Sequence, residues 1–157
     1  TALMEGTRPV LVEVQALAAP SGYGTPQRVA TGIDPKRLAV LLAVLERRGG
    51  ARFAELDVFV QVTAGVRLRE PGADLAVAAA LLSSLHNIPT PADALYLGEI
   101  GLGGEVRPIG GLERRLAEAS RLGFHRAFAS PRQGAQVPGL RHVAIAHVDE
   151  LAASLAA

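Results

Sequence analysis

The side chains that could carry chemistry in this chain are few, and their spacing matches no common catalytic pattern. The single lysine, Lys36, does not follow a glycine, so there is no P-loop to hold nucleotide phosphates. The four histidines include no pair at metal-ligand spacing, and the absence of cysteine excludes thiolate zinc sites and disulfides. Asp57, Asp74 and Glu99 are candidate acid–base groups, but helix capping and solvation explain them better. The residues alone therefore predict no catalysis, metal or cofactor in this domain.

The cationic residues are unevenly distributed, and almost all of them are arginines. Lys and Arg total 16 against 15 acidic residues, so the net charge is only +1. Residues 34–52 and 104–132 each carry a net +3, whereas residues 53–103 sum to −4. Because arginine donates several hydrogen bonds from a planar fork, two such blocks favour a phosphate-binding surface. The arginines that could contact phosphates form three clusters, the second of them outside these blocks: Arg47 with Arg48, Arg67 with Arg69, and Arg107 with Arg114 and Arg115.

Each arginine cluster also has a structural interpretation. Arg47 and Arg48 are expected in the last turn of a helix, where cations oppose the helix dipole. Arg67 and Arg69 are expected on one face of a strand, with Glu70 beside them as an ion-pair partner. Only 4 % of the residues are aromatic, which is too few for a base-stacking platform. Any contact with a nucleic acid is therefore expected to involve the phosphate backbone without sequence preference.

The elements that must position these residues alternate between strands and helices. Asp34 followed by Pro35 predicts a helix start, with a capping carboxylate and a proline at the first helical position. Leucines then recur at helical spacing until Gly49–Gly50 ends the helix. Alternating apolar and polar residues predict strands, with Phe59 in the core. Strands are expected at 9–18, 28–33, 57–66, 95–100, 105–109, 126–129 and 143–146, and helices at 35–48, 71–86, 112–122 and from 149.

These elements predict one α/β (α+β) domain over residues 1–157, with a mixed sheet and packed helices. Residues 28–33 are expected to return beside residues 9–18, and residues 95–100 to form a hairpin with residues 105–109. Hydrophobic residues make up 49 % of the chain, enough for a sizeable core. No run approaches the roughly 18 apolar residues of a membrane span, so no membrane partner is expected.

Two segments resemble the signatures of Lon-type protease domains. The stretch GEIGLGGEVRPIGGLERRL (98–116) is similar to the region in which Gly-Gly precedes the helix that bears the catalytic lysine. The stretch EPGADLAVAAALLSSL (70–85) is similar to the region in which a Pro-Ser-Ala-Gly turn places the nucleophilic serine at a helix start. The resemblance covers nearly the whole chain. It implies a Lon-protease-like domain of the ribosomal protein S5 domain 2-like fold.

Both positions of the Lon-type dyad differ from the family pattern. The serine position is occupied by Gly72, which has no nucleophilic atom, and the lysine position by Arg115. A guanidinium with a pKa above about 12 is no useful base near neutral pH. The resemblance therefore implies that this domain is not an enzyme. A serine peptidase with a displaced dyad, built on Ser83 or Ser84, is a remote alternative.

Three stretches are similar to a narrower family, the bacterial RadA (Sms) DNA repair and recombination proteins. They are MEGTRPVLVEVQAL (4–17), VATGIDPKRLAVLLAVLERRGG (29–50) and DVFVQVTAGVRLREPGADLAVAAALLSSL (57–85). In that family a zinc-binding segment and a RecA-like ATPase core precede a Lon-like domain without the protease dyad. Together with a start at Thr1 in mid-pattern, this implies a fragment of a longer chain, with ATP, Mg and Zn bound elsewhere in that chain.

The resemblance implies a cytoplasmic, DNA-dependent ATPase motor that acts on single-stranded or branched DNA during branch migration. In such a motor this domain would scaffold a hexameric ring and contribute to DNA binding. A purely structural oligomerisation domain without DNA contact is the main alternative. The residues alone hardly separate these two functions.

Overall fold

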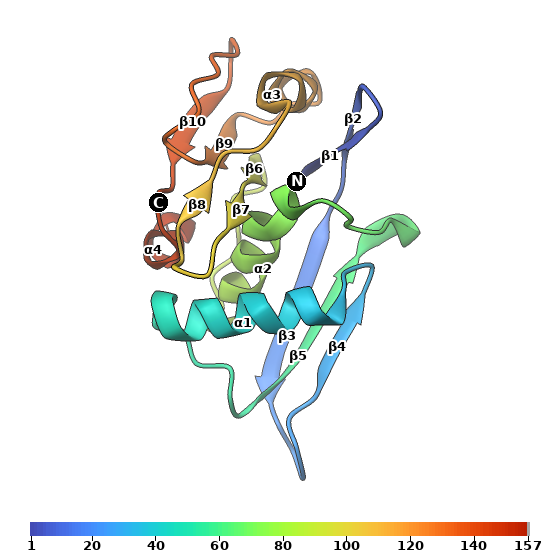
Figure 1. The fold of residues 1–157 in the computed structure, drawn as a ribbon, viewed down its shortest axis with the longest axis vertical. Coiled ribbons are helices and arrows are strands. Elements are labelled where there is room, and N and C mark those ends of the chain that lie inside the picture. Colours follow the sequence, from blue (N-terminus) through green and yellow to red (C-terminus); the bar gives the residue numbers. More distant parts are fainter. Residues whose placement is uncertain (157) are drawn as a thin grey trace.

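Two three-stranded sheets lie on either side of a central helix in the computed structural model, which describes residues 1–156 (Figure 1). The first sheet contains, in spatial order, β3 (Val14–Pro20), β5 (Leu56–Val62) and β4 (Arg28–Thr31). The second contains β10 (Arg141–Ala144), β9 (Arg126–Ala129) and β6 (Ala94–Leu97). In the first sheet β5 is antiparallel to β3 and parallel to β4, whereas the second sheet is wholly parallel. The expected mixed sheet is therefore confirmed for one half of the domain.

Two short strand pairs and four helices complete the fold. The antiparallel pairs are β1 (Ala2–Glu5) with β2 (Arg8–Leu11), and β7 (Glu99–Ile100) with β8 (Val106–Arg107). The helices are α1 (Pro35–Gly49), α2 (Asp74–His86), α3 (Leu112–Arg121) and α4 (Leu151–Leu155). Three single-turn 3₁₀ segments lie at Thr63–Gly65, Pro71–Ala73 and Val148–Glu150. The last two of these segments lead directly into α2 and α4.

Helix α1 forms as its local sequence predicts. The Asp34 carboxylate accepts from the Lys36 amide at 2.9 Å, and Pro35 occupies the first turn. Gly50 ends the helix in the left-handed conformation, where its amide donates to the Leu45 carbonyl. Between these caps, the buried residues are Leu38, Leu41, Leu42, Val44 and Leu45. With the flanking strands, α1 forms a β4-α1-β5 crossover between parallel neighbours.

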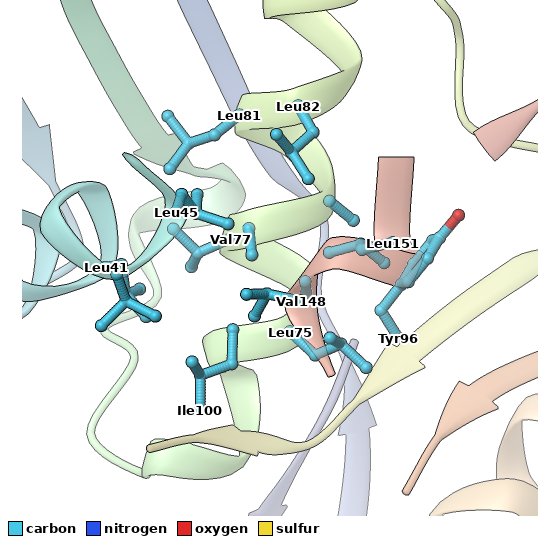
Figure 2. Close-up of a cluster of buried hydrophobic side chains, with 14 of the residues drawn as sticks. Leu41, Leu45, Leu75, Val77, Leu81, Leu82, Tyr96, Ile100, Val148 and Leu151 are labelled. Carbon is cyan, nitrogen blue, oxygen red and sulfur yellow. The ribbon is translucent and has the colours of Figure 1, made fainter. Parts of the chain in front are cut away.

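Helix α2 is the centre of the hydrophobic core. Eight of its residues are buried, so apolar side chains face outward in nearly every direction. Figure 2 shows Leu75, Val77, Leu81 and Leu82 of this helix meeting residues of α1, β6 and the C-terminal segment. A helix enclosed in this way needs no polar face. The enclosed helix fixes the position of the loop that precedes it, Val66–Glu70.

The strand pairings differ from the expected ones. Residues 9–18 form two strands that break at Val12–Glu13 and belong to different pairs, and β1, which no pattern predicted, pairs with β2. Strand β4 does not pair with β3, because β5 lies between them. The expected hairpin of residues 95–100 and 105–109 shrinks to the pair β7–β8, while β6 pairs with β9. Strand β10 lies two residues earlier than residues 143–146.

Strand β5 also differs from its prediction in its end and in its orientation. It stops at Val62, so Arg67 and Arg69 lie in an irregular segment rather than on a strand. Val58 and Val60 face the core, which places Phe59 on the opposite, open face of the sheet. There Phe59 is in register with Leu17 of β3 and Val29 of β4. The expected core position of Phe59 was wrong.

Candidate functional sites

Arg115, the residue at the expected lysine position, is buried in the first turns of α3. It is 6 % exposed, and its guanidinium is engaged on several sides. Its Nε donates to the Gly110 carbonyl at 3.0 Å, and its Nη1 donates to the Ala2 carbonyl at 2.7 Å and to Glu70 Oε1. A cation enclosed in this way presents no charge to a phosphate backbone. These contacts make Arg115 a structural residue of the domain rather than an exposed cation.

Gly72, at the expected serine position, faces a space that is already filled. A Cβ on Gly72 would lie 3.2 Å from Cδ1 and Cγ2 of Ile109 and 3.5 Å from Oε1 of Glu70. Ile109 is held there by Gln133, whose Oε1 accepts from the Ile109 amide at 2.9 Å and whose Nε2 donates to the Ile109 carbonyl. Because Glu70 Oε1 also accepts from Arg115, the structure brings positions 72 and 115 to the same carboxylate.

Ser83 and Ser84, the hydroxyls of the displaced-dyad alternative, are both used as structural hydrogen-bond groups. Ser84 Oγ accepts from the Ala18 amide of β3 at 2.9 Å, and Ser83 Oγ donates to the Ile88 carbonyl at 2.7 Å. Within residues 1–156, neither hydroxyl has a hydrogen bond to a histidine, lysine or carboxylate side chain. These two hydrogen bonds join α2 to β3 and close the C-terminal end of the helix.

Three of the predicted arginines are exposed and precede, in the chain, the two residues of the Glu70–Arg115 ion pair. Arg67 and Arg69 are exposed on the segment that leads to α2, which the Leu68 amide anchors by donating to the Gly32 carbonyl at 2.7 Å. Arg114 is exposed on α3. Arg69 and Arg114 immediately precede the two members of the Glu70–Arg115 ion pair, so this contact brings them into one region of the surface. We call Arg67, Arg69 and Arg114 the loop cluster.

The other three predicted arginines lie on α1 and on β8. Arg47 and Arg48 are exposed in the last turn of α1, on the opposite side of the view from the segment 63–70 (Figure 1). Arg107 on β8 donates to Glu105 Oε1 from Nη2 at 2.7 Å and lies 3.7 Å from Glu99. The charge of Arg107 is therefore balanced locally, whereas Arg47 and Arg48 lie where the helix dipole favours a cation.

The sequence interpretation missed a second buried ion pair. The Arg37 guanidinium donates from Nε to Asp74 Oδ1 at 3.0 Å and from Nη2 to Asp74 Oδ2 and to the Ile100 carbonyl. The Ile100 amide also donates to Asp74 Oδ2, at 3.0 Å. The hydrogen bond to Asp74 raises the pKa of Arg37. Asp74 is 4 % exposed and fully paired, so it ties α1, α2 and β7 together instead of serving as an acid or base. The one feature of the sequence that could have indicated this ion pair is the acidic Asp74 at the start of an otherwise apolar helix.

Within the described residues 1–156, no group of three or more His, Asp or Glu side chains lies close enough to hold a metal ion. No helix in that range is both long and apolar enough to cross a membrane.

Comparisons with known proteins agree with this architecture. Residues 43–144 match the family model of the Lon protease (S16) C-terminal proteolytic domain. The chain is 56 % identical over 124 residues to the DNA repair protein RadA of Brucella abortus, covering 79 % of this chain and 27 % of that protein. It is 46 % identical over 154 residues to the protein of the same name from Bacillus subtilis, covering 96 % and 33 %. For the Escherichia coli protein the identity is 51 % over 123 residues, covering 78 % and 27 %. The chain thus spans about a third or less of the length of these relatives.

Proposed function

The chain belongs to the Lon protease (S16) C-terminal domain family, in the form found in RadA-type DNA repair proteins, and on this premise we propose that it is a proteolytically inactive module of such a protein. In this proposal it scaffolds a hexameric ring and contributes to the binding of single-stranded or branched DNA in the cytoplasm. ATP, Mg²⁺ and Zn²⁺ are bound by other parts of the longer protein, which acts as a DNA-dependent ATPase.

The Glu70–Arg115 ion pair beside Gly72 is the observation that carries the proposal of inactivity. Peptide hydrolysis by a serine–lysine pair needs a hydroxyl and an amine that loses its proton. Here the first position has no side chain, and Ile109 fills the adjacent space. The second position holds a guanidinium that stays protonated and is paired with a carboxylate. Either change alone would prevent hydrolysis by a serine–lysine pair, and both point to the same conclusion.

The loop cluster supports the proposed contact with DNA. Arg67, Arg69 and Arg114 are exposed, and within residues 1–156 none of them has an ion pair with an acidic side chain. The segment that carries two of them is anchored at Leu68 and at Glu70, so little conformational freedom is lost when phosphate binds. Without a nearby aromatic platform, contacts to the DNA backbone are the expected mode of binding.

Titration of fluorescently labelled single-stranded and four-way-junction DNA tests this surface. The triple variant Arg67→Glu, Arg69→Glu, Arg114→Glu should lower affinity on the order of 100-fold at about 0.1 M salt, and reduce the salt slope on single strands by about 2. The matched control is Arg47→Glu, Arg48→Glu, Arg52→Glu, which changes the net charge equally at the other end of α1. We expect the control to lose much less affinity. Equal losses in both variants would contradict a surface confined to the loop cluster, because a net-charge effect or contact through Arg47 and Arg48 would then explain them.

The structural alternative makes a different prediction in the same experiment. If the domain only holds a ring together, neither triple variant changes DNA affinity, while light scattering after size exclusion still detects assembly by the longer protein.

Incubation with casein and fluorogenic peptides, with ATP present, tests the displaced dyad. Turnover that disappears in Ser83→Ala or Ser84→Ala would contradict the proposed inactivity.

A further inference from the structure

A groove of about 1090 Å³ is lined by the edges of both three-stranded sheets. Strand β3 is an edge of the first sheet and β6 is an edge of the second, and α2 lies between them (Figure 1). Small residues of α2 line the groove between the two edges: Ala76, Ala79, Ala80 and Ser83. The volume is at the upper end of the range of ordinary ligand sites. The groove is distinct from the Gly72 and Arg115 positions, neither of which lines it.

The backbone of β3 turns hydrogen-bonding groups toward this groove. At the two ends of β3, Thr63 donates to the Glu13 carbonyl at 3.1 Å and Ser21 donates to the Glu55 carbonyl at 3.1 Å. Odd-numbered residues therefore face β5, and even-numbered ones face the open edge. The Ala18 amide fits this alternation, because it donates its hydrogen bond to Ser84 Oγ of α2 and not to β5. By this alternation, Ala16 directs both its N–H and its C=O away from the sheet.

The edge of β6 has the same property. The Asp93 carbonyl accepts from the Arg126 amide of β9 at 3.2 Å, whereas the Gly98 amide donates to the Gly72 carbonyl on the other side at 2.9 Å. Even-numbered residues of β6 therefore turn away from β9, and Tyr96 directs its N–H and C=O toward the open edge. Exposed strand edges with unpaired groups of this kind bind an additional strand.

The Tyr96 side chain adds an unpaired polar group next to the groove. Tyr96 lines the groove and is 5 % exposed, and its hydroxyl has no hydrogen-bond partner within residues 1–156. Its ring stacks on Phe128 with centroids 4.6 Å apart, and Figure 2 shows the hydroxyl directed away from the leucine cluster. Burial raises the pKa of Tyr96 to about 12, so the hydroxyl keeps its proton and remains a donor. The hydroxyl itself is enclosed, so the main-chain N–H and C=O of Tyr96 are the groups that a bound segment can reach.

The charge of the groove restricts the class of ligand. Glu13 is its single charged side chain, and no arginine or lysine lines it. A nucleic-acid backbone or a phosphorylated ligand would find no counter-charge there. Apolar side chains line the open side: Leu17 and Leu122 are 55 % and 50 % exposed, with Phe59 and Phe124 beside them. This environment is complementary to a neutral main chain with apolar side chains.

We propose that the groove between β3 and β6 binds an extended, uncharged segment of a partner protein. The main chain of that segment would pair with Ala16 on one side and Tyr96 on the other, and so join the two sheets across α2. Its side chains would alternate between the alanine floor and the apolar open side. The site does not depend on the proposed contact with DNA, because the two surfaces share no residue.

Amide-resolved NMR with a defined peptide tests this proposal. The probe is a capped heptapeptide of alternating valine and threonine, compared with the same peptide N-methylated at alternate residues. We expect the plain peptide to shift the Ala16 and Tyr96 amides and to slow their hydrogen exchange at least about tenfold. The N-methylated peptide, which has lost the donors of one edge, should bind at least about tenfold more weakly. Equal binding of both peptides, or no protection at about 1 mM peptide, would overturn the proposal.

A variant pair provides an independent check. Ala80→Phe places a ring in the groove and should abolish binding of the plain peptide, whereas Ala117→Phe on the exposed face of α3 should not. If Ala80→Phe does not fold, the comparison of the two peptides on the unaltered chain still decides the question. In the absence of peptide, hydrogen exchange at Ala16 and Tyr96 could slow as the protein concentration rises. This result would assign the groove to a second copy of this chain and would contradict a partner segment.

Discussion

Arg115 and Glu70 form an ion pair across 45 positions of sequence, with side chains that are 7 % and 27 % exposed. Through it the start of α3 is fixed to the segment before α2. Both partners also bind β1, since Arg115 donates to the Ala2 carbonyl and Glu70 Oε2 accepts from the Met4 amide at 3.4 Å. The Glu70–Arg115 ion pair is thus a structural clamp that joins the start of α3, the segment before α2, and β1.

Loss of Glu70 should destabilise the domain substantially. Glu70→Ala leaves the Arg115 guanidinium buried without its counter-ion, and breaking a buried pair costs about 3–5 kcal/mol. Because Glu70 is partly exposed, we expect a decrease in the free energy of unfolding of about 3 kcal/mol, measured by urea denaturation. Glu118→Ala is the matched control, because its partner Arg121 lies at the surface. A loss no larger than in that control would show that the clamp contributes little.

Placing a serine and a lysine at the two predicted dyad positions should not produce hydrolysis. In the double variant Gly72→Ser, Arg115→Lys, the new hydroxyl must share its space with Ile109, and the new amine remains beside the Glu70 carboxylate. A neighbouring carboxylate favours the protonated amine, which is no base. We expect no turnover of a fluorogenic peptide and no labelling by an acylating probe. Labelling at position 72 would show that the remainder of the site is still competent.

Gly32 should be far less replaceable than Gly50, although both have left-handed backbones. Their φ angles are +81° and +71°, so either substitution by alanine strains the backbone by about 1–2 kcal/mol. A Cβ on Gly32 would also lie 2.6 Å from the Val66 carbonyl oxygen, whereas Gly50 has open space. Gly32→Ala should therefore lower the unfolding midpoint more than Gly50→Ala and weaken DNA binding, because it displaces the segment that carries Arg67 and Arg69. Equal effects would contradict this.

His147 should make stability depend on pH near neutrality. Its Nε2 bonds to the Gly103 carbonyl at 2.8 Å and its Nδ1 to Asp149 at 2.9 Å, and these contacts raise its pKa. The protonated ring therefore stabilises the fold fully below the ordinary value of about 6.5, and this contribution is lost as pH rises through the raised pKa. We expect His147→Gln to destabilise the domain more at about pH 5.5 than at about pH 8.5.

The comparison of the two proteins isolates His147 from other groups in that pH range. Burial lowers the pKa of the Thr1 amino group to about 6, but this group is present in both proteins and cancels. Hydrogen bonds lower the pKa values of Asp93, Glu105 and Glu118, so these carboxyl groups titrate below the range. A difference in the urea midpoint that does not vary with pH would contradict the prediction.

The sequence determined the elements whose signals are local. The Asp34–Pro35 start and the Gly50 end of α1 depend on residues within a few positions of each other, and the enclosed α2 follows from its apolar composition. That position 72 offers no hydroxyl and position 115 no amine is likewise a matter of residue type. These conclusions needed no partner from elsewhere in the chain.

Only the tertiary structure decided which strands pair and which arginines remain exposed. Strand β5 separates β4 from β3 because hydrogen bonds between strands depend on their placement in space, which an alternating pattern does not specify. Arg114 and Arg115 are neighbours of the same type, yet one is exposed and the other is enclosed by Ala2 and Glu70. Whether a cation is free for DNA depends on such distant contacts, because burial and pairing are properties of the folded chain.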